Sequence, residues 1–231
     1  MKKLNLIIIA MVASLLLIGG QTYGQARKTT AQVASNKGYV KGEIMKPVEA
    51  KDAAKIADGL TQKGWKTDKY TIKEQLISTW TLMSELNEET NTAKYVFVRK
   101  VNTQENLKDT KEKNYMDAMD NLGIELMAPL MIQCKAIMEQ KKINQDQMKN
   151  MMMVMKSVPH ATIQRMSRKS MEIYQENDNK FTVETYFFVD KEATLKAVKA
   201  DCLNYCKEKS MNKECVEIIE TLFRDGSKRK F

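Results

Sequence analysis

The sequence predicts an α+β fold in which a three-stranded antiparallel sheet carries one long helix, with further helices packed on it. Residues 106–140 predict one long amphipathic helix, because apolar residues recur every three or four positions from Tyr115 to Ile137 after a polar, charged opening. Residues 94–101 alternate between two faces, as a strand does. Two further strand-like segments, 165–175 and 181–189, are separated by the polar residues 176–180 and therefore predict a hairpin.

The long helix is the element around which the rest of the chain is organised. Its apolar stripe consists of Tyr115, Met119, Leu122, Leu126, Leu130, Cys134 and Ile137. The small residues Ala118, Gly123 and Ala128 lie beside large ones, which lets another element approach closely. Pro129 costs about 3 kcal/mol inside a helix, but the stripe continues past it. We therefore expect a kink within 125–129 rather than two separate helices.

Two shorter helices precede the first strand. Pro47 opens a helix over residues 47–63, and Gly64 suits the position just past its end. A capping box at Thr71–Glu74 opens the second, which extends to about Leu86.

Further helices follow the long helix and the hairpin. Asn144 caps a helix that we expect to end near Ser157, because Pro159 prevents its continuation. The last helix begins at Lys191 and breaks near Ser210 before it resumes to Phe223.

The start of the chain predicts export. Lys2 and Lys3 precede an apolar run over residues 4–18, and small residues follow, as in a secretory signal peptide. Cleavage after Gly24 or after Ala26 fits equally well. The run is shorter than the roughly 20 residues of a membrane span. We therefore expect a periplasmic or outer-membrane-associated protein, without a lipid anchor because no cysteine lies near the cleavage site.

The predicted domain organisation has four parts. Residues 1–25 form the signal peptide, and 26–45 form a polar lead-in without a hydrophobic period, which we expect to be flexible. Residues 46–224 form a single α+β domain, since a chain of this length supports one core. Residues 225–231 form a basic tail.

The charge of the chain argues against nucleic-acid binding. The net charge is +9, or +7 once Lys2 and Lys3 leave with the signal. It is dispersed except at 228–230, and aromatic residues do not interleave with it, whereas nucleic-acid binders cluster their charge. A solvated basic surface is the simplest interpretation, and it is compatible with peripheral association with anionic envelope material.

The four cysteines leave several alternatives open. A bridge between Cys202 and Cys206 would be strained on a helix, and Cys134 with a cysteine of the last helix, or Cys206 with Cys215, are alternatives. A metal site has little support because there is no paired CxxC and the single histidine, His160, is distant. Free cysteines buried as small apolar groups are the default interpretation.

The methionine-rich segment 148–155 has two interpretations. Thioethers are soft ligands, so an exported methionine cluster can bind Cu(I). Met148, Met152 and Met155 also share one helical face, as core packing or an adaptable groove for a partner helix would require.

Other polar residues carry no recognisable site. His160 is expected in a loop, and Asp117 and Asp120 share a helix as part of a solvated face. We assign no catalytic, cofactor-binding or metal-ligating residue.

Basic and acidic residues alternate along the predicted hairpin. Arg165, Arg168 and Lys169 with Glu172 and Glu184 predict cross-strand ion pairs rather than an anion site.

Several segments in order resemble exported proteins of Bacteroidetes, which are similar to the twenty-kilodalton surface lipoprotein family of Gram-negative bacteria. The segments are Gly64-Trp65-Lys66, the helix from Thr71, Tyr95-Val96-Phe97-Val98, Asn114 to Leu122 with Ala118 and Asn121, and the hairpin. The resemblance spans roughly residues 48–206. It departs from the family in lacking a lipid-carrying cysteine and in having Leu122 where members often carry a basic residue. It implies an envelope location and a fold, and no site residue.

These observations lead to one principal hypothesis. We expect a non-enzymatic, exported, envelope-associated protein that binds a protein or an envelope polymer, with sheet-edge pairing as one mode of contact. The alternative is a periplasmic carrier of a small ligand or of Cu(I), which would use Met148 to Met155. A hydrolase has no positive signal in the sequence.

Overall fold

The computed structural model describes residues 47–224, so the predicted signal peptide, the lead-in and the basic tail lie outside the described part of the chain. The described residues form six helices and three strands. Their bounds are α3 Pro47–Gln62, α4 Ile72–Ser84, β1 Tyr95–Gln104, α5 Leu107–Gln140, α6 Gln145–Met166, β2 Arg168–Asn177, β3 Lys180–Asp190, α7 Lys191–Glu208 and α8 Lys213–Arg224. This order confirms the predicted α+β class.

The strands form one antiparallel sheet in the order β1-β3-β2, and β1 runs beside β3 along its whole length. β3 follows β2 through a turn of only two residues, Asp178 and Asn179. Their φ angles of 51° and 59° suit the two-residue turns whose twist matches that of the strands. The predicted loop over 176–180 is therefore too long, because both strands extend into it.

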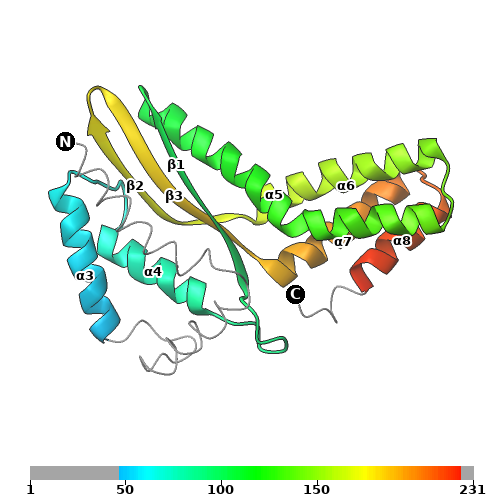
Figure 1. The fold of residues 1–231 in the computed structure, drawn as a ribbon, viewed down its shortest axis with the longest axis horizontal. Helices are drawn as coiled ribbons and strands as arrows, with labels where there is room; N and C mark the ends of the chain where they lie inside the picture. The colour runs from blue at the N-terminus through cyan, green and yellow to red at the C-terminus, as the bar shows by residue number, and fades with distance from the viewer. Residues whose placement is uncertain (1–46, 225–231) are drawn as a thin grey trace.

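Helices cover both faces of the sheet. The first half of α5 lies on one face, and α3 with α4 lies on the other (Figure 1). Buried strand residues on the α5 face include Val98, Phe187 and Val189. On the other face, a smaller core joins α3 and α4 to β2, and its buried members are Ala53, Ala57, Trp65, Ile72, Leu76, Met171 and Ile173.

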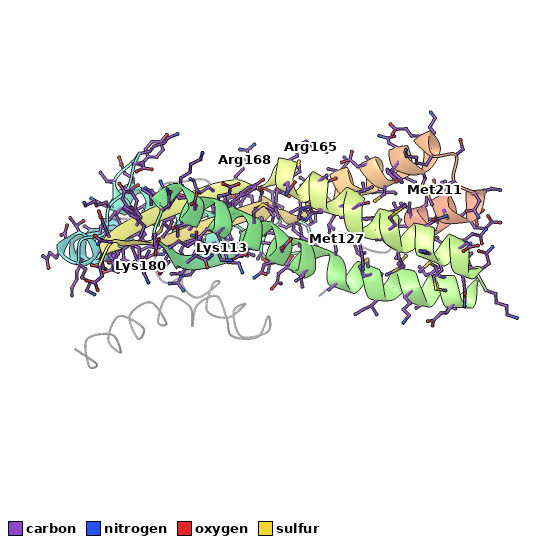
Figure 2. The ribbon with its side chains drawn as sticks, turned by 90° about the horizontal axis from the view of Figure 1, so that it is seen from above. Lys113, Met127, Arg165, Arg168, Lys180 and Met211 are labelled. Atoms are coloured by element: carbon purple, nitrogen blue, oxygen red, sulfur yellow. The ribbon has the colours of Figure 1, made fainter. Side chains whose placement is uncertain are left out.

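Beyond the sheet, the second half of α5 packs with α6, α7 and α8 (Figure 1). Figure 2 shows that the described part of the molecule is elongated, with Lys180 near one end and Met211 toward the other. The core of this helical end is rich in sulfur, and its buried members include Cys134, Met138, Met151, Met155, Cys202, Cys206 and Cys215.

Helix α5 confirms the predicted long helix, and Asn106 caps its start. The helix continues through Pro129, and Figure 1 shows it changing direction near its middle, so it bends rather than divides. Of its three small residues only Ala118 is buried. A Cβ atom on Gly123 would meet no other atom within 4 Å, and Ala128 is exposed. The predicted close approach at these two residues is wrong, because they lie on the outer side of α5.

The prediction that α6 ends before Pro159 is wrong, since the helix continues through it to Met166. The residues after the proline pack into the molecule. Thr162 and Ile163 are buried, and Oγ1 of Thr162 donates to Asp201 on α7 at 2.6 Å. These contacts offset the roughly 3 kcal/mol that an internal proline costs.

The longer α6 also changes the predicted ion pairs. Arg165 lies in α6, not on a strand, and pairs with α7. Lys169 pairs with Glu172 on its own strand at 2.9 Å. Glu184 does pair across strands, but its partner is Arg99 of β1.

One buried amide fastens α5 to the sheet. Asn114 has 0% exposure. Its Nδ2 donates to the carbonyl oxygen of Val183 and to Oγ1 of Thr185, each at 3.0 Å, and its Oδ1 accepts from Nδ2 of Asn102 at 2.8 Å. Nδ2 of Asn102 also donates to Asp117 at 3.0 Å. The network joins α5 to β1 and β3, and it uses the donors and the acceptor of the buried amide, as burial of a polar group requires.

We expect Asn114→Ala to lower the free energy of unfolding by about 2–4 kcal/mol, because it removes three hydrogen bonds of a buried amide and leaves the buried hydroxyl of Thr185 without that partner. Urea denaturation followed by circular dichroism measures the change. Asn121→Ala, at an exposed position of the same helix, is the control and should change stability by less than about 0.5 kcal/mol. Equally small effects of both substitutions would show that Asn114 does not fasten α5.

Candidate binding surface at the edge of strand β1

Strand β1 lies at an edge of the sheet and is fixed from both faces. On the α5 face, Asn102 belongs to the Asn114 network. On the α4 face, Arg99 forms a bidentate ion pair with Glu184, with Nε–Oε1 at 2.7 Å and the second contact at 3.0 Å. Burial raises the pKa of Tyr186, directly opposite Arg99, so its hydroxyl stays protonated. A strand held in this way needs little rearrangement to pair with another.

The hydrogen-bond pattern shows which backbone groups of β1 face outward. In an antiparallel pair, alternate residues direct both N–H and C=O at the partner strand, and the residues between them direct theirs away. The N–H of Lys191 donates to the C=O of Lys94 at 3.0 Å, and Lys94 precedes β1 in the same register. Even-numbered residues therefore face β3. The outward-facing residues are Tyr95, Phe97, Arg99, Val101 and Thr103.

The opposite edge of the sheet confirms this pattern and is covered. Tyr174 of β2 exchanges two backbone hydrogen bonds with Lys66, at 2.7 and 2.9 Å, so Tyr174 does not bond to Val183 beside it. The backbone of Val183 must then bond to β1. Its partner there is Asn102, so the backbone of this even-numbered residue faces β3. The N–H of Glu172 donates to Oε1 of Gln75 at 2.7 Å. β2 also carries a bulge, a common device for protecting an edge.

The outer edge of β1 has no such cover within residues 47–224. No described segment pairs with it, and none of the backbone hydrogen bonds between described residues reaches its outward N–H and C=O groups. An unpaired edge is a template for another strand. Within residues 47–224, β1 is thus the sheet edge without a pairing segment, in contrast to β2.

Apolar side chains flank this edge on the α4 face. The odd-numbered side chains of β1 lie there, and Tyr95 and Phe97 each pack against Phe188 with ring centroids 5.3 Å apart. Val101 is 43% exposed. A strand added at the edge would thus meet partly exposed aromatic and aliphatic carbon on this side.

Charged side chains flank the edge on the α5 face. Lys100 is half-buried, and its ammonium group has no ion-pair partner among the described residues. Lys113 of α5, labelled in Figure 2, precedes the buried Asn114 and lies 3.7 Å from Asp117, a long ion pair. The two faces of the edge therefore differ in chemistry, and Lys100 is the unneutralised group beside it.

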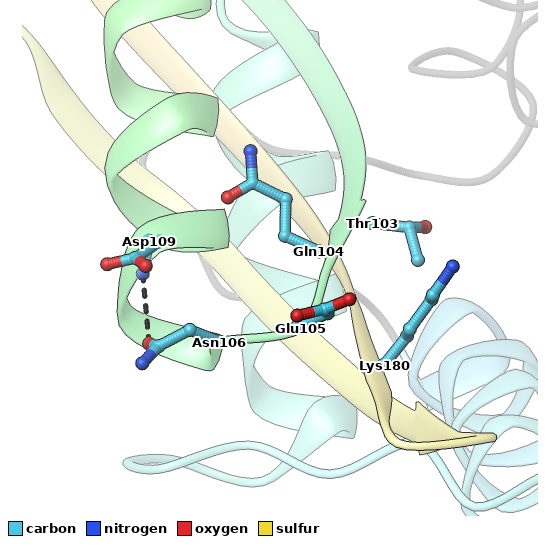
Figure 3. Close-up of a pocket in the computed structure, with 6 residues that line it drawn as sticks. All are labelled: Thr103, Gln104, Glu105, Asn106, Asp109 and Lys180. Carbon is cyan, nitrogen blue, oxygen red and sulfur yellow. Dashed lines mark hydrogen bonds between the residues drawn. The ribbon is translucent and has the colours of Figure 1, made fainter.

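A shallow depression lies at the far end of β1 (Figure 3). Oδ1 of Asn106 accepts from the backbone N–H of Asp109 at 3.3 Å, so this side chain already serves as a helix cap. The hydroxyl of Thr103 bonds to that of Thr182 at 2.9 Å. The lining is completed by Gln104, Glu105 and Lys180. Because Asn106 and Thr103 already serve the local fold, we interpret the depression as the end of the β1 edge and not as a separate ligand site.

The polar residues that the sequence singles out lie in helices. His160 is in α6 and not in a loop, because that helix is longer than predicted. Its Nδ1 lies 3.9 Å from Asp120, whose side chain is 67% exposed, and its Nε2 lies 3.0 Å from Gln164. Asp117 belongs to the network that joins α5 to β1 through Asn102. Asp117 is thus a structural residue as well as part of a polar face.

The methionine-rich segment packs into the helical end. Met151 and Met155 are fully buried, and Met148 and Met152 pack against the same core. Met153 is 51% exposed. Cu(I) binding by this segment would require buried thioethers to turn away from their packing partners.

All four cysteines are free and buried in that core. Burial raises the pKa of Cys134 and Cys206 to about 11 and that of Cys202 to about 12, and it also raises the pKa of Cys215. The thiols therefore stay protonated at neutral pH and pack as small apolar groups. No group of three or more His, Cys, Asp or Glu residues between 47 and 224 is placed to hold a metal ion.

Comparison with protein-family models, with curated protein sequences and with solved structures finds no match to this chain. The predicted family resemblance therefore rests on the sequence motifs alone. Among the helices of residues 47–224, none is long and apolar enough to cross a membrane.

The sequence predicts the strand but not its place at the sheet edge, and it assigns no contact to Lys100 or Asn114. Strand order depends on which edges meet in three dimensions, which alternation along one strand does not reveal. One available signal is the pair Arg99-Lys100, which interrupts the apolar start of the strand, because charged side chains are typical of edge strands.

We expect the four thiols to be almost unreactive toward a thiol-specific reagent at pH 8 in the native protein, since burial keeps them protonated and inaccessible. After unfolding in guanidinium chloride without reductant, all four should react. Absorbance of the released chromophore measures both states. Fewer than four reactive thiols after unfolding would show that a disulfide forms and that the cysteines are not simply core residues.

Proposed function

We propose that this protein is a non-enzymatic binding protein of the cell envelope that recognises an extended segment of another polypeptide along the outer edge of β1. The observation that carries the proposal is the contrast between the sheet edges. Gln75 and Lys66 form hydrogen bonds to the outer edge of β2, and no described segment pairs with the outer edge of β1. The envelope location rests on the basic start and apolar run of the predicted signal peptide.

A bound segment would extend the sheet by one strand beside β1. The outward N–H and C=O groups of β1 would pair with its backbone, which supplies affinity regardless of side-chain sequence. Each such hydrogen bond contributes about 0.5–1.5 kcal/mol net, so several are needed against the cost of association. Because Asn102 and Arg99 already hold β1 from both faces, most of the ordering cost falls on the partner.

The edge suits a polypeptide better than an envelope polysaccharide. Donors and acceptors that alternate at strand spacing complement the backbone of another extended chain. The net charge of +7 that remains once Lys2 and Lys3 leave with the signal adds a general attraction to anionic envelope surfaces, which brings the protein close to envelope partners without defining them.

We expect Val101→Pro to abolish partner binding without unfolding the protein. The N–H of Val101 faces outward, so proline removes a donor from the edge and leaves the ladder between β1 and β3 intact. A photo-crosslinking side chain at the exposed Thr103 in native cell envelopes reports binding. The yield of the crosslinked partner should fall at least tenfold, with an unchanged urea midpoint.

Two controls define this experiment. Val101→Thr keeps the backbone N–H and should retain crosslinking. The same crosslinker at Met153, exposed on α6, should not capture the partner. Recognition at the β1 edge is contradicted if Val101→Pro crosslinks normally or if Met153 captures the same partner.

A further inference from the structure

The side chains beside the β1 edge restrict which strand can pair there. In an added antiparallel strand, the residues opposite the outward-facing positions of β1 form hydrogen-bonded pairs. Residues opposite the even-numbered positions form the other kind of pair, in which the Cα atoms are only about 4.5 Å apart and side chains approach most closely. Lys100 is one of these positions, so the partner residue opposite it comes close to its ammonium group.

The charge at Lys100 favours one kind of partner residue. Its ammonium group has no ion-pair partner within the described residues, whereas Lys113 of α5 already pairs with Asp117 at 3.7 Å. Oppositely charged cross-strand pairs are favourable, and like charges placed directly opposite are unfavourable. A carboxylate opposite Lys100 would therefore be preferred over an ammonium group.

The neighbouring even-numbered position sets a limit on this preference. Asn102 donates to the carboxylate of Asp117 at 3.0 Å. A second partner carboxylate opposite Asn102 would approach Asp117, whose ion pair with Lys113 is long at 3.7 Å, and would be disfavoured there. The charge pattern thus selects a single acidic position and not an acidic stretch.

The α4 face of the edge has the opposite chemistry. Tyr95, Phe97 and the exposed Val101 lie there, and the nearby Arg99 is neutralised by Glu184. Partner side chains directed to this face would bury apolar surface.

We propose that the partner segment is a strand with apolar residues facing Tyr95, Phe97 and Val101 and one carboxylate facing Lys100, an inference that rests on the proposed function. Its recognition depends on the juxtaposition of an open backbone edge with one unneutralised lysine. The class of partner is an extended polypeptide with a single acidic residue on its polar face.

Two other occupants fit this edge less well. If β1 paired antiparallel with β1 of a second copy, outward-facing residues would have to lie opposite outward-facing residues. Of the registers that meet this condition, the two that pair the most residues place Arg99 opposite Arg99 or Lys100 opposite Lys100, which are like charges. The segment 36–46 of this chain carries three lysines and one glutamate, so it would bring mainly like charge to Lys100.

Synthetic ten-residue peptides test the proposal on the full mature chain. Two peptides alternate Val and Thr and differ only at one central residue of the Thr face, which is Glu or Lys. A third repeats the Glu peptide with N-methylated backbone amides on the edge that would face β1. Fluorescence anisotropy at low salt measures binding, since screening weakens exposed charge pairs.

The wild-type protein should bind the Glu peptide about three- to tenfold more tightly than the Lys peptide. Lys100→Glu should reverse this preference. Lys135→Glu, the same charge change at an exposed residue of the distant half of α5, should leave it unchanged. The N-methylated peptide should not bind.

The outcomes separate this proposal from the proposed function. Equal binding of the Glu and Lys peptides, or a preference that Lys100→Glu does not reverse, would overturn the acidic-partner inference and leave edge recognition standing. Absence of binding, or binding of the N-methylated peptide as tightly as the others, would overturn edge recognition itself. A dimer in sedimentation experiments that Val101→Pro dissociates would identify a second copy as the occupant and also overturn the inference.

Discussion

The buried amide of Asn114 is the interaction on which the arrangement of the sheet depends. Apolar packing between α5 and the strands is non-directional, so it permits neighbouring placements of the helix. An amide that uses its donors and its acceptor permits only one, because any shift leaves buried polar groups unsatisfied. Since Asn114 bonds to Asn102 on β1 and to Thr185 on β3, it fixes the helix and the two strands together.

This constraint also determines the edge. Asn102 must face α5, so every even-numbered side chain of β1 faces α5 and every odd-numbered one faces α4. A slip of one residue would exchange the two sets. The aromatic contacts of Tyr95 and Phe97 on one side, and the charge of Lys100 on the other, follow from that single assignment. The same register directs the backbone N–H and C=O groups of the odd-numbered residues of β1 away from β3.

The helical end of the molecule is held together by apolar packing of sulfur-containing side chains. Its core contains many methionine and cysteine side chains, which are flexible or small and fill irregular spaces between α5, α6, α7 and α8. Internal prolines are tolerated there because tertiary contacts support the helices on both sides of them. Thr162 and Asp201 provide one such contact after Pro159. The bend of α5 near its middle lets one helix serve both the sheet and this second core.

Most elements could be predicted from the sequence because each has a local cause. The period of α5, the capping box at Thr71–Glu74 and the glycine after α3, with φ of 83°, are all present in the structure. The errors arose where tertiary contacts outweigh local rules. Pro159 does not end α6, because the turns beyond it are packed against α7.

The candidate site was less predictable than the fold. Alternation over the first strand indicates two faces, but it cannot show that β1 lies at an edge or that Gln75 and Lys66 cover the other edge. Those facts depend on contacts between residues far apart in the chain. The role of Lys100 can be inferred only when the strand order is known. Its charge becomes notable because the lysine lies on an edge strand and forms no ion pair with a described residue.

Amide hydrogen exchange of the isolated full mature chain, resolved by residue with NMR, tests the open edge most directly. Amides of Val98, Lys100 and Asn102 bond to β3 and should exchange slowly. Those of Arg99 and Val101 between them should exchange orders of magnitude faster, which gives an alternating pattern along β1. Uniform slow exchange along the whole strand would show that the outward N–H groups are already bonded, and that β1 is not available to a partner.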